Sequence, residues 1–457
     1  MRSSRARAHS SCHAIPELRF EDQQLTSFAG VVLLQALFDR MRLRAKLTRC
    51  FPRRDGRATY RSHVVVLCLI VHLFIGFRRL RDRDFYHDDP MIKRTLGLER
   101  VPDVSTFSRT LNSVDDPSVD RLKEMASRQV LDRLNHLALR RITLDFDGSV
   151  QSTQGHLEGT AVGYNKQKKG RRSYYPLFAT VAQTQQILDL HHRPGNVHDS
   201  NGAREFIEKC VNQARKACPG GTVEARMDAA FFDQKILLWL DELGVEFTAS
   251  VPFARLAELK GFVEDRKRWV KVDERWSFFE RTWKPKSWDR PLRFVFLRQK
   301  VRRQSKAPLQ LDFFEPREHG YQYTVLVTNK AAGARTVFRF HHGRGSQEGI
   351  FADAKTSAQL DYLPVRSRNG NQTYTLCAMV AHNMAREIQM NAYEPDRRTT
   401  EKRAPLWSFE SLHRLRHRII QRAGRLTRPA GKLTLTLNSN ESLSQELQHL
   451  LQAQIGA

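Results

Sequence analysis

RITLDFDGSV, residues 141–150, is the stretch that decides the fold of this chain. Its isoleucine, leucine and phenylalanine alternate with polar residues, and successive side chains of a β-strand point to opposite faces of a sheet. The stretch therefore predicts a strand on which Asp145 and Asp147 share one face. Two carboxylates on an apolar strand are costly unless a cation compensates them, and a metal ion is the commonest such cation. The alternative is that Asp147 and Gly148 only begin a turn, because Asp-Gly is a frequent turn dipeptide.

The segments that follow this strand predict an α/β core. Residues 174–194 contain two apolar runs separated by polar residues at 183–186, which indicates two strands joined by a turn. Helices and strands then alternate, and that order is typical of α/β folds. The expected elements are an amphipathic helix over 200–217, a strand over 222–230, a helix over 231–244 and a strand over 245–252.

The region before the core, residues 25–135, is predicted to be helical. Its longest apolar run, VVVLCLIVHLFIG at 64–76, has thirteen residues, which is too short to span a bilayer and indicates a buried helix. The arginines that follow this run could face a phosphate backbone. Because Arg81 and Arg83 alternate with aspartates, a mixed-charge surface is the alternative.

The charge of the chain predicts a polyanionic partner. Lys and Arg number 76 against 49 Asp and Glu, so the formal net charge is +27 and the pI is about 10.3. Hydrophobic residues make up 40% and aromatic residues 9%, which argues against a disordered basic protein. The six cysteines show no CxxC spacing, and the N-terminus lacks the apolar core of a secretory signal. We therefore expect a cytoplasmic protein with reduced thiols, no zinc site and no membrane segment.

A further carboxylate, Asp228, ends the strand predicted over 222–230 and precedes a helix. Binding and catalytic sites of α/β folds lie at the carboxyl ends of the strands. The alternative is that Asp228 caps the helix.

HGRGSQEGIFADAK, residues 342–355, combines a guanidinium, a carboxylate and an ammonium group. If a helix begins near Ser346, Glu348 and Lys355 lie seven residues apart, or two turns, and point from one face. Arg344, between two glycines, then lies in the turn that enters the helix. The alternative is a solvated helix face, on which Glu and Lys often occur at this spacing.

Three separate segments thus each supply a carboxylate. Two divalent ions about 4 Å apart, bridged by such carboxylates, can activate water and stabilise the leaving oxygen of a phosphodiester. Mg²⁺ takes carboxylate and water ligands and needs no Cys or His, in agreement with the absence of zinc spacing. The pattern predicts metal-dependent phosphodiester chemistry.

On these motifs the chain resembles the DDE transposases of bacterial insertion sequences, over about residues 22–436. It is most similar to the group with a Tyr-x2-Arg-x3-Glu-x6-Lys signature, which Arg344, Glu348 and Lys355 match. His341 stands at the Tyr position. A histidine there could donate a similar hydrogen bond to phosphate while titrating near neutrality.

The first two carboxylates of that family map to Asp147 in DFDGS and Asp228 in RMDAAFF, with Asp145 as the alternative for the first. The resemblance implies that Asp147, Asp228 and Glu348 are catalytic and hold two Mg²⁺ ions, for which Mn²⁺ can substitute. The residues implied to contact DNA phosphate are His341, Arg344 and Lys355.

The resemblance also implies an activity and its partners. The expected reaction is cut-and-paste transposition, in which DNA is cleaved at transposon ends and the freed 3′-hydroxyl attacks target DNA. The expected partner is double-stranded DNA, bound by a homodimer at the bacterial nucleoid in the cytoplasm. Two alternatives remain open: a catalytically inactive, transposase-derived DNA-binding protein, and a ribonuclease H-like nuclease without strand transfer.

The expected fold class is α/β, with a ribonuclease H-like catalytic core that is interrupted by a strand-rich insertion. An N-terminal helical domain would bind DNA or dimerise, and a basic region would close the chain. The expected regions are 1–135 (helical), 136–251 (core, first part), 252–335 (β-rich insertion), 336–395 (core, second part, with the Glu348 helix) and 396–457 (basic C-terminal region).

Overall fold

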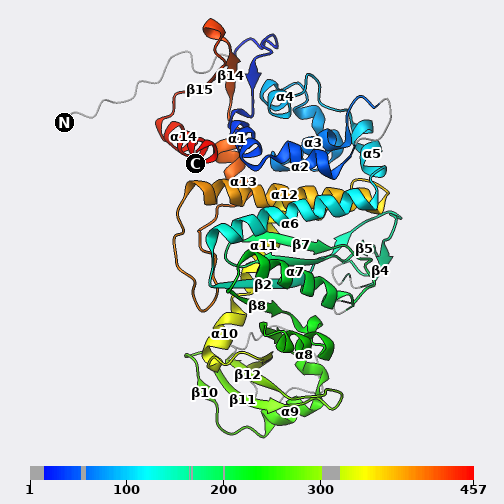
Figure 1. Ribbon diagram of the computed structural model, residues 1–457, viewed down its shortest axis with the longest axis vertical. Helices are drawn as coiled ribbons and strands as arrows, with labels where there is room; N and C mark the ends of the chain where they lie inside the picture. Colours follow the sequence, from blue (N-terminus) through cyan, green and yellow to red (C-terminus); the bar gives the residue numbers. More distant parts are fainter. Residues whose placement is uncertain are drawn as a thin grey trace, which may run out of the picture.

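The computed structural model describes residues 15–52, 58–163, 165, 168–198, 201–300 and 320–456. Residues 1–14, which include Cys12, and residues 301–319 of the predicted insertion lie outside these ranges. In Figure 1 the N-terminal helices and the C-terminal residues lie together at one end of the molecule, and a large sheet occupies the middle.

Five strands of this sheet are those predicted from the sequence. They lie in the order β7-β6-β2-β8-β9. β2 pairs in parallel with β8, and β8 in parallel with β9, whereas β6 pairs antiparallel with both β2 and β7. Two predicted helices connect them, α7 (Ala203–Ala217) and α8 (Gln234–Glu242). The prediction of an α/β fold is confirmed. The strands are β2 (Arg141–Gly148), β6 (Leu177–Val181), β7 (Gln186–His191), β8 (Thr222–Met227) and β9 (Glu246–Ser250).

Four further strands continue the same sheet beyond β9. β13 pairs antiparallel with β9, and the complete order is β10-β11-β12-β13-β9-β8-β2-β6-β7. A helix, α9 (Ala257–Glu264), lies beside these strands at the lower end of Figure 1. The strands of the predicted insertion therefore extend the central sheet. Their bounds are β10 (Val270–Lys271), β11 (Trp276–Trp283), β12 (Leu292–Lys300) and β13 (Tyr321–Thr328).

The two faces of the sheet differ in chemistry. On β2, Ile142, Leu144 and Phe146 are buried in one apolar cluster together with Phe206 and Ile207 of α7. The alternate residues of β2 and of its neighbours are polar and equally buried, as the two-residue period of a strand requires. We call this set the polar layer; its members are Thr143, Asp145, Glu224, Arg226 and Thr248.

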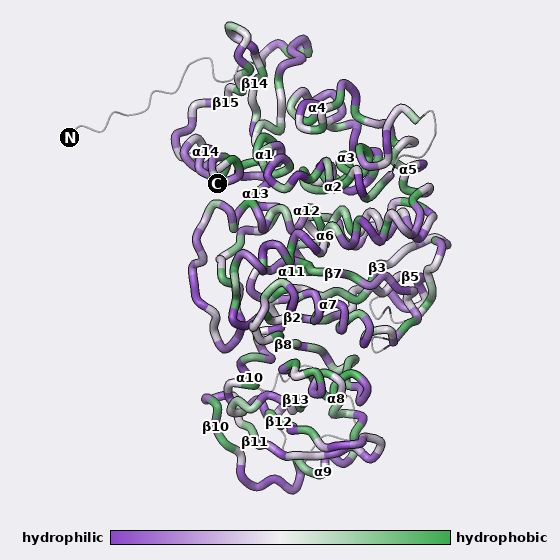
Figure 2. Tube along the Cα trace, in the orientation of Figure 1, coloured by the Kyte–Doolittle hydropathy of each residue, from purple (hydrophilic) through white to green (hydrophobic). Residues whose placement is uncertain are grey.

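The polar layer is covered by α10 (Ala334–His342) and by the segment 397–406. Arg226 Nη1 donates to the carbonyl oxygens of Phe340 and Lys402, each at 2.9 Å. Leu406 N donates to Gln183 O at 2.9 Å. In Figure 1 this part of the chain leaves the central helices, runs down beside the sheet to α10 and returns, and Figure 2 shows that it is largely hydrophilic.

The N-terminal region is helical, as predicted. Residues 64–74 of the apolar run lie in α3, and the run continues for two residues beyond the end of this helix. α3 is buried and packs against α12 (Arg368–Ala392), which is itself almost wholly buried. Within the described ranges, no helix combines the length and apolar character needed to cross a membrane. The helices are α1 (Val32–Met41), α2 (Leu43–Cys50), α3 (Ser62–Phe74), α4 (Pro90–Leu96), α5 (Val104–Asn112) and α6 (Asp116–Leu137).

The C-terminal residues return to the N-terminal helices. A short strand, β1 (Leu25–Thr26), pairs with β14 (Gly424–Thr427), which pairs with β15 (Thr434–Leu437). The last helix, α14 (Glu441–Ile455), packs on α1 and α12. The N- and C-terminal regions of the described chain thus fold together.

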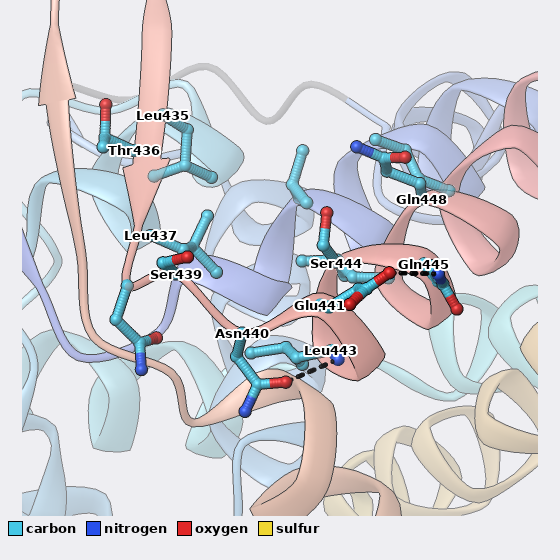
Figure 3. A pocket seen from close by; sticks show the side chains of 14 residues that line it. Leu435, Thr436, Leu437, Ser439, Asn440, Glu441, Leu443, Ser444, Gln445 and Gln448 are labelled. Carbon is cyan, nitrogen blue, oxygen red and sulfur yellow. Dashed lines mark hydrogen bonds between the residues drawn. The ribbon is translucent and has the colours of Figure 1, made fainter. Parts of the chain in front are cut away.

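A surface pocket of about 670 Å³ lies between β15 and α14, as Figure 3 shows. Leu435 and Leu437 of β15 line it, as does Leu443 of α14. Leu447 of α14 is a further lining residue. The carboxylate of the pocket is Glu441, whereas the predicted site residues do not line it. The pocket is therefore separate from the predicted catalytic residues.

Candidate active site

The first two predicted carboxylates follow neighbouring parallel strands. Phe146 of β2 and Met227 of β8 are register partners, so Asp147 and Asp228 come next in each strand at the same edge of the sheet. Both are half-buried. Asp228 also caps a short 3-10 helix, because its carboxylate accepts from Ala230 N at 2.9 Å. The predicted helix itself, α8, is capped by Asp233, so Asp228 caps only the 3-10 helix that precedes it, at a position that also fits a site.

Glu348 lies in α11 (Gly345–Ser357), the helix predicted to begin near Ser346. The preceding residue, Gln347, is buried, and its Nε2 donates to Asp145 O at 2.9 Å. This hydrogen bond anchors the first turn of α11 directly on β2. Glu348 is exposed beside it, and Lys355 is half-buried in the last turn of the same helix.

Arg344 contacts the first of these carboxylates. Its Nη2 donates to Asp147 Oδ2 at 2.8 Å, and the two side chains are only 18% and 22% exposed. A charge-assisted hydrogen bond of this kind is among the stronger polar contacts in proteins. The guanidinium that was predicted to bind phosphate thus neutralises a predicted metal ligand.

Asp145 is fully buried and is paired with Arg226 in a bidentate ion pair. Arg226 Nε lies 2.5 Å from Asp145 Oδ1, and Nη2 lies 2.7 Å from Oδ2. The cation that compensates Asp145 is therefore a guanidinium. This pairing favours Asp147, the half-buried residue at the strand end, as the first carboxylate of the site.

A match to a known family covers nearly the whole chain. Residues 14–455 match the family described as Transposase DDE domain group 1. The chain belongs to this DDE transposase family. The resemblance seen in its sequence motifs is confirmed.

Two solved transposase assemblies are similar to this DDE family member. One is the piggyBac transposase synaptic complex with hairpin DNA, at 10% identity and a TM-score of 0.39, covering 86% of this chain and 80% of that one. The other is the Drosophila P element transposase strand transfer complex, at 18% identity and a TM-score of 0.23, covering 47% of this chain and 43% of that one. No curated protein matches the chain.

His341 makes two hydrogen bonds inside the protein. Its Nδ1 lies 2.9 Å from Thr248 Oγ1, and its Nε2 lies 2.9 Å from Ser250 Oγ, both on β9. Burial, together with the nearby charges of Arg344 and Arg226, lowers the pKa of His341 to about 3. The expectation that this histidine titrates near neutrality is wrong, because its charged form is both desolvated and repelled. Its contact with phosphate stays a prediction.

A second buried carboxylate lies at the opposite end of the polar layer. Glu224 accepts from Arg403 Nε at 2.7 Å, from Lys330 Nζ at 2.8 Å and from Arg141 Nη1 at 2.8 Å. Burial favours its neutral form, but the bonds from Arg403 and Lys330 outweigh this and lower the pKa of Glu224 to about 2. Glu246 at the start of β9 completes the group, which we call the Glu224 cluster.

Sequence reasoning missed Arg226, although a signal was present. Arg226 precedes Asp228 by two residues, and Asp145 precedes Asp147 by the same spacing. An arginine inside an apolar strand, two residues before a candidate carboxylate, indicates a buried partner on the adjacent strand. Arg403 offered no such signal, because it lies in a basic run that resembles a solvated surface.

The donor groups at this edge fit a hard divalent cation. Asp147, Asp228 and Glu348 offer carboxylate oxygens, the ligands that Mg²⁺ takes in phosphoryl-transfer sites. Within the described ranges, however, no group of three His, Cys, Asp or Glu residues is gathered closely enough to hold a metal ion. The oxygen atoms of these side chains are thus of the kind that Mg²⁺ takes, but the three carboxylates do not form a metal-binding group in the described structure.

Proposed function

We propose that this chain is a transposase that cleaves DNA at transposon ends and joins the freed 3′-hydroxyl to target DNA. The observation that carries the proposal is the parallel register of β2 and β8, which brings Asp147 and Asp228 to one edge. Membership of the DDE transposase family supports the same reaction class.

The catalytic fold we propose is ribonuclease H-like. In chain order, the five predicted core strands lie third, second, first, fourth and fifth across the sheet, and the first strand pairs in parallel with the fourth. That arrangement is the one expected of a ribonuclease H-like core, with its first strand at the centre. The strands after β9 and the N- and C-terminal regions would then be additions to this core.

In the proposed reaction, Asp147, Asp228 and Glu348 hold two Mg²⁺ ions, or Mn²⁺ in their place. When bound, these ions would supply the positive charge that stabilises the attacking and leaving oxygens of the phosphodiester. The carboxylates of the two strands are fixed by the sheet, and α11 carries the third on a helix anchored through Gln347. Strands held in a sheet and a helix turn anchored by a hydrogen bond would limit the movement of these carboxylates, and such chemistry depends on oriented groups.

The proposed phosphate contacts are Arg344 and Lys355, with His341 beside them. Arg344 presents a planar fork that can hold two phosphate oxygens, whereas Lys355 acts as a point charge. Because Arg344 is paired with Asp147, its move to a phosphate would accompany DNA binding. His341, neutral and bonded to Thr248 and Ser250, would contribute a hydrogen bond without a change of charge.

The proposed substrate is double-stranded DNA held by a homodimer. The net charge of +27 supplies the general attraction for phosphate. Exposed arginines occur where the N-terminal region meets the start of α12, and Ser367 N donates there to Asn112 Oδ1 at 3.2 Å. These arginines are Arg79, Arg81, Arg109, Arg366 and Arg368.

One observation favours the alternative of an inactive, DNA-binding descendant. Arg344 is already paired with Asp147, and the described carboxylates form no group that could hold a metal ion. DNA cleavage separates the two functions. The substrate is DNA carrying the inverted repeats that flank the gene, and the active enzyme nicks it with Mg²⁺ but not with EDTA.

Two experiments are needed, one to test the proposed site and one to test strand transfer. In the first, Glu348→Gln should bind the end DNA and fail to cut it; cutting at the native rate would overturn the assignment of the site. In the second, joined products in a plasmid target distinguish a transposase from a nuclease without strand transfer.

A further inference from the structure

The buried pair of Asp145 and Arg226 has an unusual place in the sheet. The two residues are direct register partners on parallel strands, and each precedes a proposed metal ligand by two residues. Residues two apart on a strand point to the same face. The pair therefore lies on the same face as Asp147 and Asp228, two residues before them along each strand.

Arg226 also bonds to both segments that cover the polar layer. Nε and Nη2 bond Asp145, and Nη1 donates to Phe340 O and Lys402 O at 2.9 Å each. A single fully buried guanidinium thus joins β8, β2, the end of α10 and the segment 397–406. A lysine has one donor centre and cannot make these contacts in four directions.

The turn that carries Arg344 is fitted closely around this guanidinium. At Gly343, an added Cβ would collide with the carbonyl oxygen of Lys402 and with Arg226 Nη1. Arg344 follows directly and reaches back to Asp147. The position of the turn, and hence the entry to α11 with Glu348, is therefore defined by contacts with Arg226.

We propose that Arg226 is a positioning residue for the reaction. It sets the two carboxylates of β2 and β8 against the α10–α11 turn, so that Glu348 and Arg344 meet them in the geometry that cleavage requires. The inference rests on the proposed function for its catalytic meaning. Removal of the Arg226 charge would leave the buried Asp145 unpaired and destabilise the fold, whereas Arg226→Lys keeps the charge and loses the fork. The inference therefore predicts that Arg226→Lys acts on the site more than on the stability of the fold.

The central test compares Arg226→Lys with Arg141→Lys. Arg141 begins the same strand as Asp145 and pairs with Glu224 and Glu246 at the other end of the polar layer, at 2.8 Å each. We expect Arg226→Lys to lower kcat for cleavage at least tenfold and to weaken Mn²⁺ binding, measured by calorimetry. The Kd for end DNA without metal should stay within about twofold, and Arg141→Lys should keep native kcat.

A second readout is independent of activity. Hydrogen–deuterium exchange should rise in residues 340–348 and 400–404 of Arg226→Lys, while residues 292–297 of β12 stay protected. If the wild-type chain does not cleave DNA, the proposed function fails, and the exchange pattern still tests the positioning role.

Two results would overturn the inference. One is native kcat and native metal affinity in Arg226→Lys. The other is a loss of kcat that matches the loss of unfolding temperature equally in Arg226→Lys and Arg141→Lys. Should Arg226→Lys not fold, Asp145→Asn takes its place, because it keeps the shape of the pair and removes one charge. It is held to the same kcat, metal affinity and exchange criteria.

Discussion

The two ends of the polar layer carry the same kinds of residue in different states. At the Glu224 cluster, two carboxylates are surrounded by three cations, Arg141, Lys330 and Arg403, and Glu224 is fully buried. At the opposite end, Asp147 and Asp228 are half-buried, Arg344 pairs with Asp147, and Glu348 is exposed.

We interpret the Glu224 cluster as a structural group and the carboxylates at the other end as the proposed site. Where cations match or outnumber buried carboxylates, each carboxylate is already paired within the fold. Such carboxylates are not available to bind a metal ion. Where carboxylates are half-buried or exposed, their oxygens remain within reach of solvent and of the metal ion we propose. The comparison predicts activity effects at the carboxyl end of β2 and stability effects at the Glu224 cluster.

The largest effect is expected at the carboxyl end. Asp147→Asn, Asp228→Asn and Glu348→Gln should each reduce Mg²⁺-dependent cleavage by about a thousandfold or more, because the metal depends on these groups as a unit. DNA binding, spread over 76 basic residues, should persist in a gel-shift assay.

Asp233→Asn is the control for these variants. It caps α8 by accepting from Lys235 N at 2.8 Å, and asparagine caps helices equally well, so cleavage should be native. If instead Asp147→Asn stays active and Asp145→Asn does not, the first carboxylate has been placed two residues too late.

The next effect is on stability, at the Glu224 cluster. Glu224→Gln leaves buried cations without their counter-charge and should cost about 3–5 kcal/mol of unfolding free energy in urea melts. Glu280→Gln, which removes an exposed pair with Arg293, should cost less than about 1 kcal/mol. Equal costs for the two variants would contradict the comparison.

The same cluster fixes how stability depends on acid. The folded pKa of Glu224 is lowered from 4.5 to about 2, so its contribution is present above pH 4.5 and is lost as the pH falls towards 2. Glu224→Gln should flatten the stability curve in that window.

A smaller effect on rate is expected at Arg344. Arg344→Lys keeps the charge but loses the fork, and should lower cleavage by about ten- to a hundredfold, the value of a charged hydrogen bond. Arg339→Lys is the control, since Arg339 makes an exposed pair with Glu401. Native cleavage by Arg344→Lys would mean that the turn before α11 is only a surface feature.

Lys355 should respond differently from Arg344. Lys355→Arg should keep more activity than Lys355→Ala, because a point charge tolerates a change of shape. Metal affinity should barely change in either variant. Weakening of metal binding by Lys355→Ala to the level of Glu348→Gln would contradict this.

The smallest effect concerns His341. Because its folded pKa is about 3, it stays neutral through neutral pH, and His341→Gln should leave the shape of the pH–rate profile unchanged between about pH 5 and 8. Loss of a titration step near pH 6.5 in the variant would show that the histidine is charged in the working enzyme.

Periodicity predicted the regular elements of the core well. The alternation in residues 141–150 and 222–227 predicted β2 and β8. Because binding sites of α/β folds lie at the carboxyl ends of strands, Asp147 and Asp228 were candidate site residues. The small sheet formed by β3 (Gln151–Ser152), β4 (Ala161–Val162) and β5 (Arg172–Tyr174) was missed, since two- and three-residue strands contain no period.

Burial of basic residues could not be predicted from local sequence. Arg416 was assigned to a basic tail, yet it is buried and donates to Phe74 O at 2.9 Å and Ser357 O at 2.8 Å. Carbonyl oxygens from helices far away in sequence create that environment, and only the tertiary fold brings them together. For Arg226 the local sequence did carry a signal of burial, but its partner Asp145 lies 81 residues away and is identified only by the register of β2 and β8.

The pairing of β1 with β14 has a consequence for synthesis on the ribosome. Leu25 and Thr26 find their strand partners only at Arg425 and Gly424, and Ala29 N donates to Arg422 O. At about 5–20 residues per second, the N-terminal helices emerge tens of seconds before these partners do. A nascent chain that stops before residue 424 leaves that edge and the α14-binding face of α1 open. The fold of the N-terminal region is thus complete only when translation has nearly ended.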